Sequence, residues 1–292
     1  MQSKRDKLTI QGVGKLSLHQ IKPDIEHLYI EHQKFQATIS LHGGQVLTYV
    51  PRNQQPVLWL SRNSVYDNQK AIRGGIPICF PWFGPKENCP QHGFARNMLW
   101  KLTTYDMTPE QVVIKLELEG EKLLPEWPYK FQLIQTLIFA DNFTQKLEVR
   151  NLDQQAFEIS YALHSYFNVS NPEKTSIPDL NSVVFTEQGA DDIQCSPVDV
   201  NDCVGPIDRN YVSDDSINIL DSGYERVVSV QKKNSNHWVL WNPGQELANK
   251  MADVHPHGEQ EYVCLEAAQL TPISVLPQET YSFEQTIRIS IL

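Results

Sequence analysis

Apolar and polar side chains alternate along much of this chain. Ile114, Leu116 and Leu118, for example, alternate with Lys115 and Glu117. Successive side chains of a β-strand point to opposite faces of its sheet, so this spacing is typical of a strand that buries one face and exposes the other. The pattern restricts the chain to folds built from sheets with a packed face.

Several segments have this alternation or are otherwise strand-like: residues 35–41, 44–50, 112–119, 130–140, 143–150, 236–243 and 281–290. Asp141-Asn142 joins two of them as a tight hairpin turn would, and residues 151–155 join the next two, so successive strands are expected to be antiparallel. Helical patterns are confined to residues 121–127 and 246–251, about two turns each, too little for alternating strands and helices. The sequence predicts an all-β, antiparallel two-sheet sandwich with a few short helices.

Residues 171–221 are rich in Asp, Asn, Ser and Pro, as an interdomain linker would be. Strand-like runs resume in the same style on both sides, so we expect long loops and short strands within one domain spanning residues 1–292. A hydrophobic content of 40% is enough for an extensive core.

Charge and composition narrow the function. The formal net charge of −10 argues against a nucleic-acid partner, which would need clustered Lys and Arg. No apolar run reaches roughly 18 residues and the first residues lack an apolar signal core, so we expect no membrane span and a cytoplasmic protein. The five cysteines include no Cys-x-x-Cys pair, which favours reduced thiols over disulfides or a zinc site.

The segment RGGIPICFPWFGP, which begins at Arg73, is dense in glycine and proline, and QHGFAR, which ends at Arg96, follows it closely. These residues forbid long regular structure and predict a shaped loop packed on the sandwich. Paired guanidinium groups suit a phosphate, which they bind through charge-assisted hydrogen bonds. The structural alternative is a buried loop whose arginines only satisfy carbonyl groups.

His164 belongs to the strand-like run FEISYALHSYFN. With a period of two it shares a face with Ser160, Ala162 and Tyr166. A strand histidine is more often a structural residue, but a pKa near neutrality makes it the most versatile proton donor for a sugar cleft.

Glu266 lies in the middle of the otherwise apolar run YVCLEAA. Burying a carboxylate without partners costs several kcal/mol, so this residue is expected either to form a structural salt bridge or to perform chemistry.

Five segments occur in the order seen in one known family: RGGIPICFPWFG; QHGFAR with Trp100; LHSYFNV; WNP; and YVCLEAA. With these motifs the chain resembles the YeaD-type branch of the aldose 1-epimerase superfamily, the hexose-6-phosphate mutarotases. The resemblance extends from about Phe35 to the C-terminus.

The resemblance implies a β-supersandwich of the galactose mutarotase type, no cofactor and no metal. It also implies His164 and Glu266 as catalytic residues, and substrate contacts at Arg73, Gln91, His92, Arg96 and Asp208. The segment around Asp208 departs from the family's commoner form, so Asp202 or Asp215 are alternatives.

We expect an isomerase that interconverts the anomers of glucose 6-phosphate and related hexose 6-phosphates. Glu266 would take the proton of the anomeric hydroxyl while His164, on the opposite side, protonates the ring oxygen. The expected partner is the sugar phosphate alone, with no protein partner implied.

Two other functions remain open. One is a free-aldose 1-epimerase, and the other is a non-catalytic carbohydrate-binding sandwich that uses aromatic residues such as Trp82, Phe83 and Tyr166. A glycoside hydrolase is disfavoured because such enzymes usually use two carboxylates.

Overall fold

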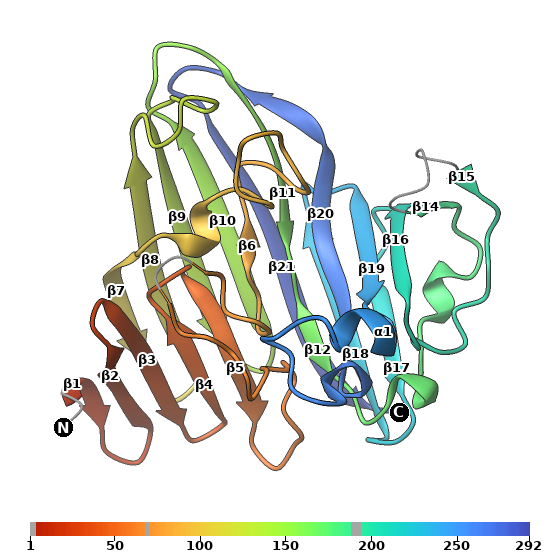
Figure 1. Ribbon diagram of the computed structural model, residues 1–292. Coiled ribbons are helices and arrows are strands. Elements are labelled where there is room, and N and C mark those ends of the chain that lie inside the picture. The colour runs from red at the N-terminus through yellow and green to blue at the C-terminus, as the bar shows by residue number, and fades with distance from the viewer. Residues whose placement is uncertain (1–3, 68–69, 188–193) are drawn as a thin grey trace.

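The strands form three antiparallel sheets (Figure 1). The computed structural model describes residues 4–67, 70–187 and 194–292. The N-terminal sheet contains, in order, β1 (Lys4–Ile10), β2 (Gly14–Lys22), β3 (Ile25–His32), β4 (Phe35–Ser40) and β5 (Gln45–Pro51).

The second sheet, called here the β10 sheet, has the order β13 (Thr175–Ser176), β17 (Ile217–Asp221), β18 (Arg226–Lys233), β21 (Thr280–Ile291), β10 (Phe143–Asn151), β9 (Phe131–Phe139), β8 (Val112–Gly120) and β7 (Lys101–Met107). The third, called the β20 sheet, has the order β15 (Gln194–Cys195), β14 (Phe185–Glu187), β16 (Ile207–Val212), β19 (His237–Asn242), β20 (Tyr262–Val275), β11 (Phe157–Leu163) and β6 (Ile78–Cys79), with β12 (Tyr166–Asn168) paired to β20. The helices are α1 (Gly244–Ala248) and the single 3₁₀ turns η1 (Ala95–Asn97), η2 (Pro172–Lys174), η3 (Pro178–Leu180) and η4 (Gly258–Gln260).

The β10 sheet packs against both other sheets. Phe35 of β4 stacks on Phe139 of β9 with ring centroids 5.4 Å apart, and Tyr161 of β11 stacks on Phe283 of β21 at 3.6 Å. Buried apolar residues from all three sheets form one continuous cluster. The predicted all-β antiparallel sandwich is therefore confirmed, but it contains three sheets rather than the two expected. The extent of the domain stays a prediction.

A chain of buried glutamines crosses the core between the sheets. Gln145 donates to Gln135 at 2.6 Å and accepts from Gln285 at 3.0 Å, and all three are fully buried. Gln135 also donates to the carbonyl of Gly44, beside the N-terminal sheet, and Ser165 donates to Gln285 from the β20 sheet. Because Ser165 adjoins His164, this chain ties the position of that histidine to the whole sandwich.

The strand-like runs named from the sequence are strands, except that the run over residues 157–168 is interrupted at His164 and Ser165, between β11 and β12. Two further local expectations are wrong. Residues 121–127 form a turn closed by a bridge between Leu124 and Trp127 rather than a helix, because Pro125 interrupts the run and Trp127 is buried among aromatic rings. Residues 151–155 do not close a hairpin, since they carry the chain from β10 to β11, which lies in the other sheet. The amide of Asn151 fixes this crossing by donating to the carbonyls of Gln155 and Val275.

The helix expected over residues 246–251 exists as the shorter α1, which begins at Gly244. The stretch 171–221 contains loops, β13 to β17 and two 3₁₀ turns, with residues 188–193 outside the described part of the chain. None of the five cysteines forms a disulfide. None of the helices that the structure describes combines the length and the apolar character needed to cross a membrane.

Replacing Gln145 by leucine should destabilise the fold. The change leaves a carbonyl oxygen of Gln135 and an amide of Gln285 buried without partners, at a cost of about 1–3 kcal/mol each. We expect urea denaturation to show a free energy of unfolding lower by about 2–4 kcal/mol. The control, Gln231→Leu on an exposed position of β18, should change it by less than about 0.5 kcal/mol. Equal stability of the two variants would contradict a role for the glutamine chain.

Candidate active site

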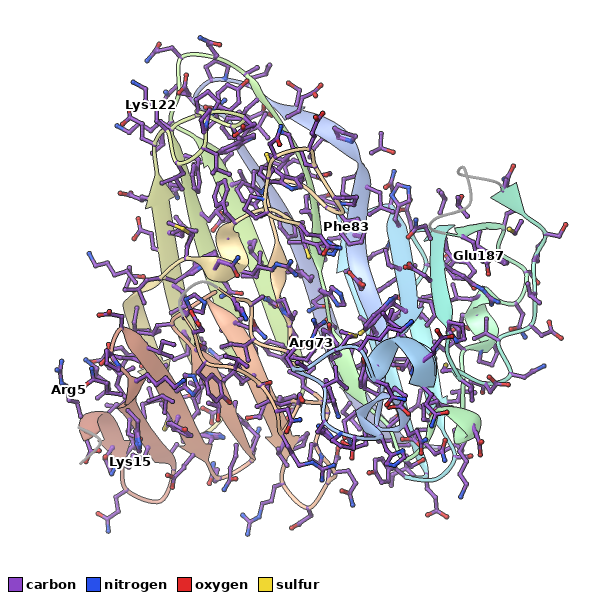
Figure 2. All side chains as sticks on the ribbon, viewed as in Figure 1. Arg5, Lys15, Arg73, Phe83, Lys122 and Glu187 are labelled. Carbon is purple, nitrogen blue, oxygen red and sulfur yellow. The ribbon has the colours of Figure 1, made fainter. Side chains whose placement is uncertain are left out.

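One cavity of about 400 Å³ brings together the two residues expected to be catalytic and the five expected to contact the substrate. It is lined by Arg73, Gln91, His92, Arg96, His164, Asp208 and Glu266, together with Phe83, Val239, Trp241, Leu247 and Met251. Figure 2 shows Arg73 and Phe83 near the middle of the molecule, on the loops between β5 and β7. The strands of the β20 sheet supply the floor and these loops supply much of the wall.

His164 and Glu266 are direct neighbours across two strands. Leu163 pairs with Ala267 and Tyr166 pairs with Cys264, so the register places His164 opposite Glu266. Nε2 of the histidine lies 3.3 Å from Oε1 of the glutamate. We expect from the sequence that the two residues lie on opposite sides of a sugar, but in the structure they are in contact. The contact arises because β11 and β12, on either side of His164, both pair with β20 around Glu266.

This pair is buried and incompletely bonded. His164 is 8% exposed and Glu266 only 1%. Nδ1 of the histidine and Oε2 of the glutamate have no hydrogen-bond partner in the structure. Buried polar atoms are nearly always satisfied, and exceptions are common where a ligand or a reaction completes the bonding.

The environment drives both groups toward their neutral forms. Burial raises the pKa of Glu266 well above its usual value, the neighbouring charge of Asp208 raises it further, and the charge of Arg96 opposes this shift. Burial also lowers the pKa of His164, and so do the nearby His92, Arg96 and Arg73. Burial therefore opposes the charged form of each group.

Arg73 is held by two partners. Its Nε donates to Asp253 at 3.1 Å, and its Nη1 donates to the hydroxyl of Tyr166 at 2.8 Å. The ring of Tyr166 in turn stacks on His164, with centroids 4.8 Å apart and planes 6° from parallel. The guanidinium is thus already neutralised by a carboxylate and is joined to the histidine through one aromatic ring.

Arg96 has no such partner. Its Nη2 donates to the backbone carbonyl of Gln91 at 2.7 Å, and its Nε is buried without a hydrogen bond. Among the residues described, no carboxylate forms an ion pair with it. An uncompensated guanidinium that lines a cavity is suited to bind an anion.

His92 is kept neutral and oriented by its loop. Nδ1 accepts a hydrogen bond from the backbone N–H of Gly84 at 3.1 Å, so the proton of the neutral ring is on Nε2. Burial, Arg96 and Arg73 together lower its pKa to about 3. The ring is therefore a hydrogen-bond donor across the neutral pH range. The next residue, Gly93, has a positive φ of 71°, and a side chain there would meet the carbonyl of Phe80.

Asp208 of β16 lines the cavity, whereas the alternatives Asp202 and Asp215 do not. Burial, followed by the charge of Glu187, raises the pKa of Asp208 to about 6.

Of the aromatic residues considered from the sequence, Phe83 lines the cavity and the ring of Tyr166 stacks on His164. Trp82 is buried, and its N–H donates to the backbone carbonyl of Pro90.

Two functional neighbours were missed from the sequence, Asp253 and Trp241. Asp253 lies 180 positions from Arg73, and no local pattern links the two. Trp241 lies in WNP, a motif whose residues suggest no role by themselves. Among residues 4–67, 70–187 and 194–292, no three His, Cys, Asp or Glu side chains are grouped as metal ligands would be.

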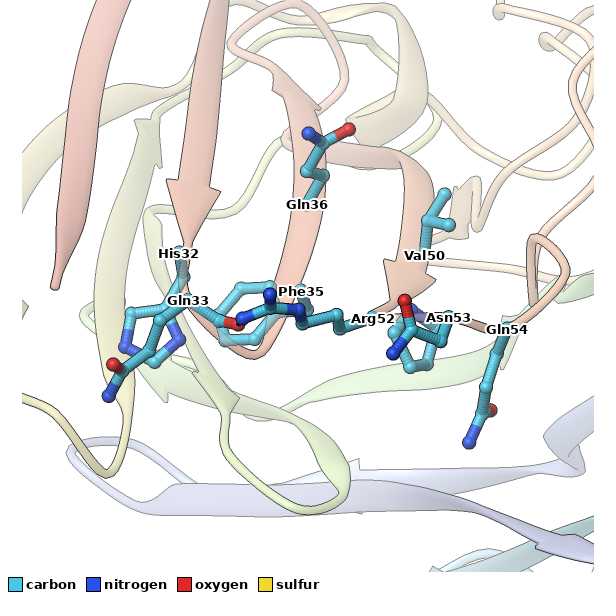
Figure 3. Close-up of a pocket in the computed structure, with 9 residues that line it drawn as sticks. His32, Gln33, Phe35, Gln36, Val50, Arg52, Asn53 and Gln54 are labelled. Atoms are coloured by element: carbon cyan, nitrogen blue, oxygen red, sulfur yellow. The ribbon is translucent and has the colours of Figure 1, made fainter. Parts of the chain in front are cut away.

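Another depression lies at the ends of β3, β4 and β5 (Figure 3). It is lined by His32, Gln33, Phe35, Gln36, Val50, Pro51, Arg52, Asn53 and Gln54. This surface contains no carboxylate that could act with the histidine. It therefore lacks the acid–base pair that distinguishes the first cavity.

A family model described as aldose 1-epimerase matches residues 26–288. The chain belongs to the aldose 1-epimerase family. A protein of Escherichia coli K12 named "Putative glucose-6-phosphate 1-epimerase" is 31% identical over 280 residues, which cover 91% of each chain. A protein of the same name from Cenchrus ciliaris is 31% identical and covers 84% of this chain and 78% of its own.

Solved structures of the aldose 1-epimerase family share the fold. The crystal structure of a "putative mutarotase (YeaD)" from Salmonella typhimurium superposes with a TM-score of 0.89 at 28% identity, covering 99% of this chain and 97% of the other. Galactose 1-epimerase from Lactobacillus acidophilus superposes with a TM-score of 0.72 over 100% of this chain, and at 12% identity it supports the fold alone. The predicted family and the galactose mutarotase-like fold are confirmed.

The buried carboxyl group should limit the stability of this epimerase at high pH. The folded state raises the pKa of Glu266. Its carboxyl group therefore stays protonated at pH values above 4.5, where an unperturbed carboxyl group ionises. The unfolded state binds fewer protons there, so the stability contributed by this group is lost as pH rises. We expect Glu266→Gln to gain stability over the wild type between about pH 5 and about pH 8, in urea denaturation.

The exposed control Glu126→Gln should have the same free energy of unfolding as the wild type at both pH values. A constant difference between Glu266→Gln and wild type across this range would show that Glu266 is ionised in the folded protein.

Proposed function

We propose that this epimerase interconverts the α and β anomers of glucose 6-phosphate and of related hexose 6-phosphates, by ring opening and closure. The observation that carries the proposal is the contact between His164 and Glu266 in a cavity that also presents guanidinium groups. The names of the relatives from Escherichia coli and Cenchrus ciliaris support the substrate.

The chemistry needs one base and one acid. Glu266 takes the proton from the anomeric hydroxyl and His164 gives a proton to the ring oxygen, so that the bond between C1 and the ring oxygen breaks and an aldehyde forms. Rotation about the C1–C2 bond presents the other face, and closure returns both protons. The two oxygens are bonded to the same carbon, so an acid and a base in contact with each other, as His164 and Glu266 are, can serve both.

The arginines favour a phosphorylated sugar. The 6-phosphate is attached through C6 to the carbon that carries the ring oxygen, so it lies on the side of the sugar that faces His164. Arg96 and Arg73 line the same cavity as His164. Gln91, His92 and Asp208 remain to bind the sugar hydroxyls, and binding at these remote groups holds the ring in place while it opens.

The two alternative functions explain fewer features of this cavity. A free-aldose 1-epimerase has no need for the uncompensated guanidinium of Arg96. A non-catalytic binding module has no need for a buried acid–base pair with unsatisfied atoms, which costs stability.

Loss of either catalytic group should nearly abolish the activity. General acid or base catalysis contributes about 10²–10⁴-fold, so we expect a fall of that size in His164→Ala and in Glu266→Gln. The measurement is magnetisation-exchange NMR between the anomers of glucose 6-phosphate. The control Glu126→Gln should keep the wild-type rate, and a rate within about threefold of wild type in Glu266→Gln would exclude it as the base.

Removing the unpaired guanidinium should affect the phosphorylated sugar selectively. Arg96→Ala loses charge-assisted hydrogen bonds to the phosphate, and we expect a rise of at least about tenfold in KM for glucose 6-phosphate. The KM for free glucose should change far less. Equal effects on the two sugars would contradict the assignment of Arg96 as a phosphate ligand.

A further inference from the structure

The ring of His164 lacks the hydrogen bond that usually orients a catalytic histidine. In such residues the nitrogen that does not react is commonly held by a hydrogen bond to a carbonyl or carboxylate. Here Nε2 contacts Glu266, but Nδ1 has no hydrogen-bond partner among the described residues. The residue also lies between β11 and β12 rather than within a paired strand. Other contacts therefore have to fix the plane of the imidazole.

Three aromatic rings surround this imidazole. The ring of Tyr166 stacks on it, with centroids 4.8 Å apart and planes 6° from parallel. The rings of His92 and Trp241 stand at 76° and 82° to it, each with its centroid 6.0 Å away. Aromatic pairs prefer stacked and edge-to-face arrangements, and all three contacts have one of these geometries. Rotation of the imidazole would disturb every one of them.

Tyr166, the stacked neighbour, is itself held on several sides. Its hydroxyl accepts a hydrogen bond from Nη1 of Arg73 at 2.8 Å. The ring of Trp59 stacks on it at 5.8 Å, with planes 22° apart. In the backbone, its carbonyl accepts from the N–H of Trp59 and its own N–H donates to the carbonyl of Gly75, both at 2.9 Å. The phenol ring therefore cannot shift without moving Trp59.

The indole of Trp59 is anchored by a carboxylate near the surface. Its Nε1 donates to Oε2 of Glu261 at 2.9 Å. Nε2 of His255 lies 2.9 Å from the same oxygen, and Nη2 of Arg62 donates to Oε1 at 2.8 Å. The line of contacts from Glu261 through Trp59 to Tyr166 is called here the supporting column. It runs from a partly exposed ion pair to the face of the catalytic imidazole.

We propose that the supporting column positions the imidazole of His164 for proton transfer to the ring oxygen of the sugar. Its members are positioning residues, since none of them lines the cavity. The stacked ring sets the plane of the imidazole, and the contact with Glu266 selects the nitrogen that faces the substrate. This inference rests on the proposed function.

The expected consequence is a loss in the chemical step rather than in substrate binding. A displacement of about 1 Å in a catalytic group can cost on the order of a hundredfold in rate. A residue that touches only the back of the histidine does not contribute to substrate affinity, so kcat should fall while KM stays.

The first experiment compares Tyr166→Leu with Tyr166→Phe. Both lose the hydrogen bond to Arg73, but only the leucine variant loses the stacked ring. We expect kcat for anomer exchange of glucose 6-phosphate to be about tenfold or more lower in Tyr166→Leu, and within about threefold of wild type in Tyr166→Phe. The two KM values should agree within about twofold. Equal kcat values in the two variants would overturn the proposal.

A matched control separates positioning from a general loss of stability. Tyr49→Leu removes a buried phenol ring that packs on Phe139 and Phe143 outside the cavity. We expect this variant to lose stability in urea denaturation and to keep the kcat of wild type. A fall in kcat as large as that of Tyr166→Leu would show that loss of a core ring suffices, and the inference would be wrong.

The second experiment keeps every buried ring and needs no activity. Glu261→Ala removes only the carboxylate at the outer end of the column, and Glu246→Ala removes the carboxylate of a surface ion pair with Lys250. The carbon-bound ¹H signals of the His164 ring, assigned with His164→Asn, report its stacking because the ring current of Tyr166 shifts them. We expect these signals to move in Glu261→Ala and to stay in Glu246→Ala. Unchanged signals in both would overturn positioning through Trp59.

The outcomes also separate this inference from the proposed function. If the wild type does not accelerate anomer exchange of glucose 6-phosphate, the proposed function is wrong, and the His164 signals alone decide whether the column holds the ring. If the wild type accelerates exchange and Tyr166→Leu keeps its kcat, the mutarotase function stands and the positioning role is wrong.

Discussion

The register between β20 and the β11–β12 segment is the constraint on which the site depends. It places His164 opposite Glu266, with their polar atoms 3.3 Å apart. A shift of one residue would turn Glu266 to the other face of the sheet, because side chains alternate along a strand. The glutamine chain that reaches Ser165 from the β10 sheet helps hold this register, so the core and the site are not independent.

Burial favours the neutral form of both members of this pair, the carboxyl of Glu266 and the imidazole of His164. The positive charges of Arg96 and Arg73 add to this effect at His164, whereas Arg96 opposes it at Glu266. Such a site is unfavourable for stability and favourable for a reaction that needs a proton to move between two neighbouring oxygens. The arrangement explains why polar atoms of both residues are left without partners.

Much of this could be predicted from residue patterns. Alternation located the strands, and the motifs named seven residues that line one cavity. The errors came where local pattern was ambiguous. Residues 121–127 contain apolar residues at helical spacing, but Pro125 and the burial of Trp127 favour a turn. The polar turn after β10 is compatible with a hairpin, and only the packing of β11 in the other sheet excludes one.

The sequence by itself determined the class of fold and the identities of the chemical groups, because periodicity and residue type are local properties. Only the tertiary structure decided which groups meet. Asp253 neutralises Arg73, whereas no carboxylate in the described part of the chain pairs with Arg96, although the two arginines lie in neighbouring segments of the sequence. Likewise the contact between His164 and Glu266 arises from strand pairing across about a hundred residues, and no local pattern encodes that pairing.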